Sequence, residues 1–172
     1  MFGKNAKNGR GFRVLAAVLL LGGALALSSC GSRVVAHTPK TVLDIFSLFS
    51  LTQAQQQTDA ALALAAEKGH AEAMRQITRE KAFWDGDSYV FVIDVRTKKI
   101  AAHPVDPSLI GQIVGTISSE RVGREILATD EKGRWVEYEW NNPKTGEVER
   151  KISWVKLSGH YIYGSGAYEK GE

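Results

Sequence analysis

Two apolar runs separated by a short polar turn constrain the fold of this chain more than any other feature. Tyr89 to Ile93 are consecutive aromatic or aliphatic residues, a run of β-strand length. The polar residues Arg96 to Lys99 form a turn, and the second run closes at His103-Pro104. We predict a central β-hairpin whose first strand is apolar on both faces. Such a strand must be covered twice, so the preceding helices and the following strands should pack around it.

The first thirty residues have the pattern of an export signal. Four basic residues precede Val14, and the apolar run from Val14 to Leu27 is short for a membrane span. Leu27-Ser28-Ser29-Cys30 follows, and it resembles the lipobox of bacterial lipoproteins, which are cleaved before the Cys and acylated on it. We predict a lipoprotein signal peptide at 1–29 and a lipidated Cys30 with a linker at 30–40. The alternatives are an ordinary signal peptide that contains a Cys, or an uncleaved anchor.

Loss of residues 1–29 would change the charge of the chain. The sequence has 22 Lys and Arg and 19 Asp and Glu, and four of the basic residues but none of the acidic ones precede Cys30. The remainder therefore carries about one net negative charge, which gives no electrostatic case for a nucleic-acid partner. It is long enough for one domain with a real core. We expect an exported protein, periplasmic or at the cell surface, attached to the membrane by its lipid anchor.

Helical spacing marks the stretch before the hairpin. Apolar residues recur at nearly helical intervals from Val42, and a run rich in Ala, Leu and Gln continues to Lys68. We predict a long helix from Thr41 to Lys68 and a shorter amphipathic helix from Ala71 to Phe83. His70 is expected to be a solvated residue of the turn between them.

The chain after the hairpin divides into an irregular segment and three strands. Residues 105–132 contain Pro107 and several glycines, so they cannot form one regular element, although a short helix is predicted from Ser118 to Thr129. Loops of this length commonly cover a site. The strands are predicted at Arg134 to Trp140, Glu147 to Lys156 and Tyr161 to Tyr168. The whole order indicates an α+β domain with an antiparallel sheet.

Alternation along these strands predicts which side chains share a face. Val136, Tyr138 and Trp140 should lie on one face of their strand. In the next strand, Trp154 should lie opposite Lys151, against the long helix.

Several short motifs, in order and at consistent spacing, resemble the extracytoplasmic Cache family, most nearly its single-domain type. They span about Ala60 to Tyr168 and are Tyr89-Val-Phe-Val-Ile-Asp94, Ala102-His103-Pro104, Leu109-Ile-Gly111, Gly133 with Tyr138-Glu-Trp140, Lys151-Ile-Ser-Trp-Val155 and Gly164-Ser-Gly-Ala-Tyr168. The resemblance implies a long N-terminal helix packed on a PAS-like antiparallel β-sheet of about five strands, and a single ligand-binding domain at 41–172. A small-molecule pocket should lie under the inserted loop.

Two departures from the family pattern affect the expected function. Trp154 stands where the family usually has Tyr, and no transmembrane helix follows Tyr168. We therefore expect the domain to act through a separate membrane partner, such as a receptor, kinase or transporter.

The resemblance also implies a ligand class, because single Cache domains of this type often bind short organic acids. A small carboxylate needs a cation and a few fixed donors in a mostly apolar cavity. We predict ligand contacts from five residues, with Lys151 as the cation: Tyr89, His103, Tyr138, Trp140 and Lys151. The alternatives are that Lys151 is a solvated rim residue, that His103 is a core histidine, and that Tyr138 or Trp140 is only core. Tyr168 is expected to close the fold.

The two other classes of function are an enzyme and a structural or interaction protein. Gly164-Ser165-Gly166 lacks the hydrolase Gly-x-Ser-x-Gly spacing, and the histidines at 37, 70, 103 and 160 include no pair at helical metal-binding spacing. No phosphate-binding or dinucleotide motif is present, so we expect no catalysis, metal or cofactor. The remaining alternative is a structural or interaction lipoprotein that has lost its ligand, and a filled cavity beneath residues 105–132 would indicate it.

Overall fold

The computed structural model describes residues 42–169, with side chains from residue 48. The predicted signal peptide, Cys30 and the linker lie outside the described residues. The chain divides into two compact units, Met1–His37 and Thr38–Glu172, and the fold below is that of the second. Among residues 42–169, no helix combines the length and apolar character needed to cross a membrane.

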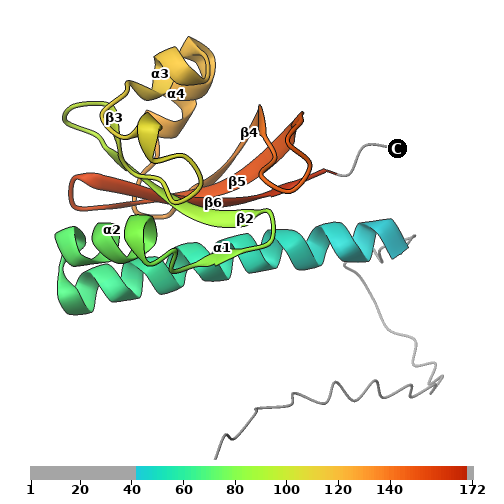
Figure 1. The fold of residues 1–172 in the computed structure, drawn as a ribbon, viewed down its shortest axis with the longest axis horizontal. Helices are drawn as coiled ribbons and strands as arrows, with labels where there is room; N and C mark the ends of the chain where they lie inside the picture. Colours follow the sequence, from blue (N-terminus) through green and yellow to red (C-terminus); the bar gives the residue numbers. More distant parts are fainter. Residues whose placement is uncertain (1–41, 170–172) are drawn as a thin grey trace, which may run out of the picture. The chain divides into compact units, whose positions relative to one another are not determined.

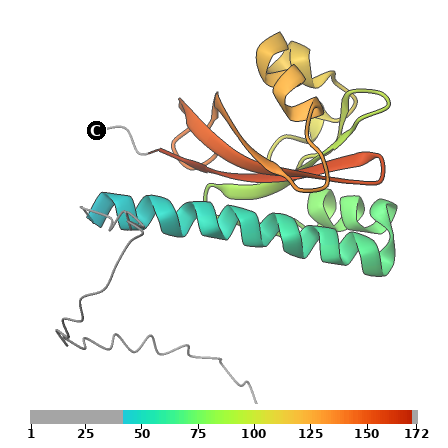
Figure 2. The ribbon, with the colours of Figure 1, turned by 180° about the vertical axis from the view of Figure 1, so that it is seen from behind.

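Two consecutive helices lie along one face of the sheet (Figures 1 and 2). They are α1, Val42–Lys68, and α2, His70–Arg79. The buried residues of α1 are Ala54, Thr58, Ala61 and Ala65, which recur every three or four positions and form one stripe. These side chains are small, so the helix backbone can lie close to β5 and β6.

The sheet is antiparallel throughout and has six strands. They are β1, Trp84–Asp85; β2, Ser88–Asp94; β3, Lys99–Ala102; β4, Arg134–Asn141; β5, Val148–Ser158; and β6, Tyr161–Tyr168. The strand order is β1-β2-β6-β5-β4, with β3 also paired to β2. The predicted α+β fold and the β2–β3 hairpin are confirmed. The prediction that the hairpin is central is wrong, because β6 pairs with both β2 and β5 and occupies the middle.

Both faces of β2 are covered, as its apolar sequence predicts. Val90 and Val92 belong to the core between the sheet and the two helices. Tyr89, Phe91 and Ile93 belong to a second core on the opposite face, beneath residues 105–132. This second core is where the ligand site was predicted.

Residues 105–132, here called the insert, fold into short helices above the second core. They are the 3₁₀-helix Pro107–Leu109, α3, Val114–Ile117, and α4, Glu120–Leu127. The helix predicted over 118–129 is thus shorter than expected, because Ser119 is its N-cap and accepts a hydrogen bond from the Val122 N–H at 3.2 Å. The two α-helices touch at Gly123, where an added Cβ would lie only 2.7 Å from the Gly115 Cα.

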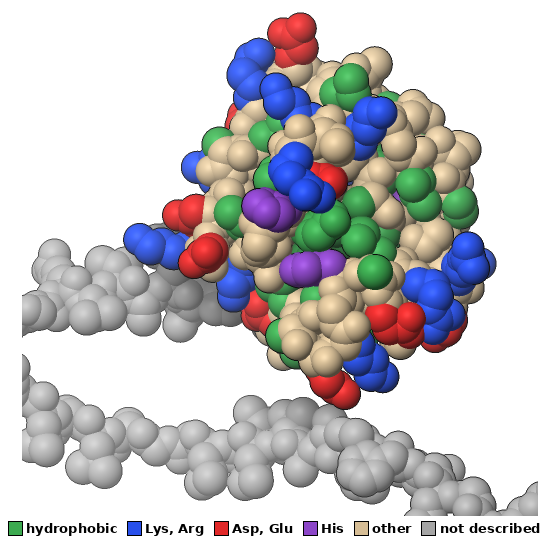
Figure 3. Space-filling model, turned by 90° about the vertical axis from the view of Figure 1, so that its left-hand side faces the viewer, with side chains coloured by type: hydrophobic (Ala, Val, Ile, Leu, Met, Phe, Trp, Pro, Cys, Tyr) green, Lys and Arg blue, Asp and Glu red, His purple; other side chains and the backbone are tan. Residues whose placement is uncertain are grey.

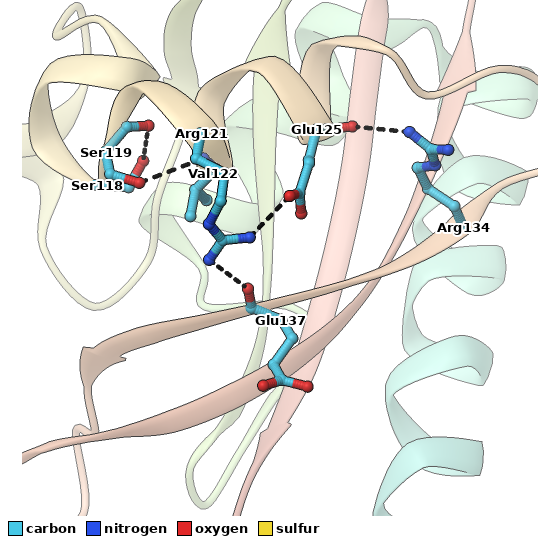
Figure 4. A network of polar contacts seen from close by, with 7 residues as sticks. All are labelled: Ser118, Ser119, Arg121, Val122, Glu125, Arg134 and Glu137. Atoms are coloured by element: carbon cyan, nitrogen blue, oxygen red, sulfur yellow. Dashed lines mark hydrogen bonds and ion pairs between the residues drawn. The ribbon is translucent and has the colours of Figure 1, made fainter.

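Polar contacts join the insert to strand β4 (Figure 4). The Arg121 guanidinium donates to the Glu125 carboxylate at 2.7 Å and to the Glu137 carbonyl at 3.4 Å. Arg134 of β4 donates to the Glu125 carbonyl at 3.3 Å. Arg121 is 60% exposed, so these contacts contribute little stability. The insert is held mainly by the burial of Val114, Val122 and Ile126, which are at most 3% exposed.

Two predictions about α2 are corrected by the structure. The helix ends at Arg79 instead of Phe83, since Lys81 and Phe83 adopt left-handed backbone angles that no helix continues through. His70 is not a freely solvated turn residue. It begins α2, and its Nδ1 lies 2.9 Å from the Tyr163 hydroxyl. Figure 3 views this end of the molecule, where histidine side chains reach the surface beside hydrophobic ones.

A polar cluster fastens α1 to the sheet. The Gln57 side-chain carbonyl accepts hydrogen bonds from the Ser88 hydroxyl of β2 at 2.6 Å and the Ser165 hydroxyl of β6 at 2.7 Å. Both serines are buried, so their hydroxyls depend on Gln57 and on each other for partners.

Candidate functional site

Strand alternation brings the candidate residues to one face of the sheet. Tyr138 of β4 is the antiparallel partner of Lys151 in β5, and Lys151 is in turn the partner of Tyr168 in β6. The side chains of Tyr138, Lys151 and Ser153 are buried on this face, whereas Trp154 is only partly buried. The predicted facing of these strands is therefore confirmed.

A small cavity lies between this face and the insert. Its volume is about 30 Å³. It is lined by Tyr89, Phe91, Ile93, Ile100, His103, Val114, Ile117, Ser118, Val122, Ile126, Tyr138 and Trp140. Four of the five predicted site residues are thus brought together, with Lys151 excepted. The space suits about one or two water molecules.

A larger open pocket of about 440 Å³ adjoins the cavity. The two share Tyr89, His103, Ile117 and Trp140 in their walls. The open pocket adds polar groups at its rim, namely Asp106, Glu139 and Asn141. The open pocket therefore borders the candidate site through these shared residues.

Lys151 lies deeper than the cavity wall. Its side chain is fully buried, so the interpretation as a solvated rim residue is wrong. The Nζ lies 3.8 Å from the ring centroid of Tyr89, 4.8 Å from that of Tyr168 and 5.8 Å from that of Phe91. It has no hydrogen-bond partner among residues 42–169. Burial lowers the pKa of Lys151 to about 7, with a smaller opposing effect from the Asp87 charge.

Gly166 of β6 provides the space that this lysine occupies. A Cβ at position 166 would meet the Ser153 Oγ first, and it would lie 2.7 Å from the Ile152 carbonyl oxygen and 2.8 Å from the Lys151 Cε. The Gly-Ser-Gly sequence of β6 therefore has a packing role beside Lys151.

The Tyr89 ring contacts both Lys151 and His103. Its centroid lies 5.1 Å from that of the His103 imidazole, in an edge-to-face arrangement. Its hydroxyl lies 3.4 Å from the Tyr168 hydroxyl, which donates to the Asn141 carbonyl at 2.7 Å. Burial raises the pKa of Tyr89 to about 12, so the phenol is neutral and can donate.

His103 is a buried, neutral donor. Its Nδ1 accepts a hydrogen bond from the Asp106 backbone N–H at 3.0 Å, which places the proton of the neutral imidazole on Nε2. The pKa of His103 is lowered to about 4, first by burial and then by the charge of Lys151, against the opposing effect of Asp106. The side chain is 3% exposed and lines both the cavity and the open pocket.

Tyr138 and Trp140 complete the predicted set. The Tyr138 hydroxyl lies 3.0 Å from the Ser153 hydroxyl, and burial raises its pKa. The Trp140 ring lies 6.1 Å from the Tyr138 ring and is partly exposed. Tyr138 thus has an internal partner, as a core residue would, while Trp140 forms wall in both the cavity and the open pocket.

The prediction missed several residues of the site. Phe91 and Ser153 share the correct strand parity with Tyr89 and Lys151, and this signal could have found them. Ile117 and Ser118 come from the insert, whose path no periodicity indicates. Tyr168 closes the fold as predicted, through Asn141, but it also contacts Lys151.

Within the described part of the chain, no three His, Cys, Asp or Glu side chains are grouped as metal ligands.

The chain belongs to the single Cache domain family, since the sequence model of Single Cache domain 2 matches residues 45–168. No curated protein matches the chain. A methyl-accepting chemotaxis protein from Vibrio parahaemolyticus has a similar structure, with 14% identity and a TM-score of 0.61 over 73% of this chain and 93% of that one.

Two further solved structures share the fold. A Cache chemosensory domain described for its recognition of carboxylic acids is 23% identical, with a TM-score of 0.50 over 76% of this chain and 100% of its own. The periplasmic sensor domain of a chemotaxis protein is also 23% identical, with a TM-score of 0.52 over 75% of this chain and 99% of its own. At these identities the likeness establishes the fold, and the ligand must be argued from this chain's own site.

Proposed function

We propose that this domain binds a small organic molecule outside the cytoplasm, with a short carboxylate as the first candidate. The observation that carries the proposal is the Lys151 amine, buried among aromatic rings behind the cavity and without a hydrogen-bond partner in the described chain. A carboxylate is the group that would complete such an environment. The solved Cache domain described for carboxylic acid recognition supports this choice of ligand class.

The roles of the site residues follow from their geometry. Lys151 supplies the cation, and the Tyr89 hydroxyl and the His103 Nε2–H supply donors. Trp140 and Tyr138 form wall, with the Tyr138 hydroxyl already paired to Ser153. Membership of a family of sensory domains favours binding over catalysis.

Binding inside the cavity requires local movement, because its volume of about 30 Å³ is smaller than a carboxylate such as propionate. The open pocket provides the approach, and the Tyr89 ring contacts Lys151 at its inner end. The insert is held mainly by the burial of Val114, Val122 and Ile126, so a movement that admits a ligand beneath it would have to disturb this packing.

The proposal extends to the rest of the chain. Residues 1–29 would direct export, the acylated Cys30 with its linker at 30–40 would hold residues 41–172 at a membrane surface, and a separate membrane receptor, kinase or transporter would take the signal. Mass spectrometry of the cell-derived protein tests this directly, because an acylated mature N-terminus at Cys30 is expected. An intact Met1 or an unmodified Cys30 would contradict it.

Thermal unfolding against a panel of short carboxylates, amino acids, amines and urea tests the ligand. A true ligand at a hundred times its Kd should add about 2.7 kcal/mol to the free energy of unfolding. We expect a carboxylate to raise the Tm, Lys151→Met to abolish the rise, and the exposed Lys132→Met to retain it. A carboxylate that stabilises Lys151→Met equally well would contradict the assigned role.

A second candidate function is supported by the small size of the cavity. A domain whose cavity is filled by its own side chains could serve as an interaction module, with no small-molecule ligand. If no compound of the panel shifts the Tm, this function replaces the first.

Amines are included in the panel because Asp106 and Glu139 contribute carboxylates to the open pocket. Turnover of any compound would indicate an enzyme.

A further inference from the structure

The surroundings of Lys151 do little to stabilise an ammonium group. A protonated lysine has three N–H donors, and the Lys151 Nζ makes no hydrogen bond within residues 42–169. Its contacts are the faces of aromatic rings, the nearest being Tyr89 at 3.8 Å. Ring faces compensate only part of the cost of burying a charge. The neutral amine is therefore the form that this environment accommodates best.

The titratable side chains that the neighbouring elements place around Lys151 are uncharged near neutral pH, so they do not favour the charged form of its amine. Burial raises the pKa of Tyr89 on β2, Tyr138 on β4 and Tyr168 on β6, so all three phenols remain neutral. His103, after β3, is neutral as well because its pKa is about 4. No ion pair joins Lys151 to a described carboxylate.

Two carboxylates act on the site from outside it. Asp87, in the turn before β2, favours the charged form of Lys151 weakly through space. Asp106, in the insert, acts on His103 and Tyr89, and its oxygen already accepts from the Ser108 N–H and hydroxyl at 3.0 and 2.6 Å. Neither replaces a direct partner for the Nζ.

We propose that binding of a carboxylate at this site is coupled to the uptake of one proton by Lys151. The inference rests on the proposed function and adds a pH dependence to it. The neutral amine, a proton from the solvent and the carboxylate anion together give an ammonium–carboxylate pair. The only covalent bond formed is N–H, and the charge of anion and proton cancels on binding.

The direction of the effect follows from the acid–base state of the amine. A carboxylate beside the Nζ favours the ammonium and raises the pKa of Lys151 above its ligand-free value of about 7. The affinity for the carboxylate should therefore be constant while Lys151 of the free protein is protonated, and it should fall once Lys151 loses this proton. Between pH 6 and pH 8 the apparent Kd should rise about tenfold, although the ligand itself stays ionised throughout.

Isothermal titration calorimetry of the full chain tests the coupling, with acetate and propionate as probes. At each pH the binding enthalpy is measured in two buffers of different ionisation enthalpy, such as phosphate and Tris, and their difference gives the number of protons taken up. We expect about 0.9 proton per bound anion at pH 8 and about 0.1 at pH 6. The Lys132→Met variant, altered at an exposed lysine, should give the same values.

The outcomes separate the coupling from the function on which it rests. A probe that binds at pH 8 without proton uptake overturns the coupling and leaves the binding function intact. A probe that binds at neither pH overturns both for that ligand class. Carbon-13 NMR of lysine Cε provides a ligand-independent measurement: the resonance absent from Lys151→Arg should titrate near pH 7 in the free protein, and titration near 10 would overturn the coupling.

Discussion

The Nζ of Lys151 lies 3.8 Å from the centroid of the Tyr89 ring, and neither residue exposes more than 1% of its surface. The ring face stabilises the charged form of an amine in this position, whereas the loss of water destabilises it. The second effect is larger, which is why the pKa of Lys151 lies near 7 instead of above 10.

Replacing Lys151 by Met should make the stability of the protein less dependent on pH. The native pKa of about 7 lies below the unfolded value, so the unfolded chain binds more protons between about pH 7 and pH 10. The wild type should gain up to about 1.4 kcal/mol per pH unit in this window, a gain that Lys151→Met lacks. Urea unfolding at pH 7, 8 and 9 measures both slopes. Parallel curves for the two proteins would show that Lys151 has an ordinary pKa.

Replacing Gly166 by Ala should disturb the packing of β6 against β5, including Lys151. The added Cβ would meet the Ser153 Oγ, the Ile152 carbonyl oxygen at 2.7 Å and the Lys151 Cε at 2.8 Å, so we expect a loss of about 1–3 kcal/mol in the free energy of unfolding. The ligand-induced rise in Tm should disappear with it. Gly115→Ala is the matched control, because its Cβ would meet nothing closer than 3.8 Å. Equal tolerance of both substitutions would mean that the sheet yields at position 166.

The insert should depend on packing far more than on its ion pairs. Ile126 is 2% exposed, so Ile126→Ala should cost about 2–5 kcal/mol. Arg121→Ala, which removes the contacts drawn in Figure 4, should cost less than about 1 kcal/mol. Denaturant unfolding of the two variants gives both values. A larger loss of stability from Arg121→Ala than from Ile126→Ala would show that polar contacts, and not packing, hold the insert in place.

Replacing Gln57 by Ala should weaken the contact between α1 and the sheet. The Ser88 and Ser165 hydroxyls would lose their shared acceptor while remaining buried, at a cost of about 1–3 kcal/mol. Hydrogen exchange should show less protection in α1 and β6. The control is Gln55→Ala, on the exposed side of the same helix, which should change stability by less than about 0.5 kcal/mol.

Local periodicity predicted much of this molecule. Alternation placed Tyr138 and Trp140 on one face of β4, and the apolar run at Tyr89 to Ile93 predicted a strand covered on both sides. Both are properties of neighbouring residues along one strand. The family resemblance supplied what periodicity cannot, namely the order of the layers and the position of the pocket.

Other features depend on contacts between distant segments. The middle place of β6 follows from its pairing with β2 and β5, which alternation in β6 itself does not reveal. The full burial of Lys151 could not be read from its own strand, because lysine is usually solvated and the neighbouring Gly166 lies on another strand. His70 gained a partner, Tyr163, from the far end of the chain.

Adjacent residues of β6 serve opposite sides of the sheet. Gly166 abuts the Lys151 side chain, while Ser165 donates to Gln57 of α1. Residues one peptide link apart in β6 therefore connect the candidate ligand face with α1, so a shift of β6 at Gly166 should also change the Gln57 contact. The Ser165 hydroxyl lies 3.2 Å from that of Ser88, so strand β2 of the hairpin shares in this connection.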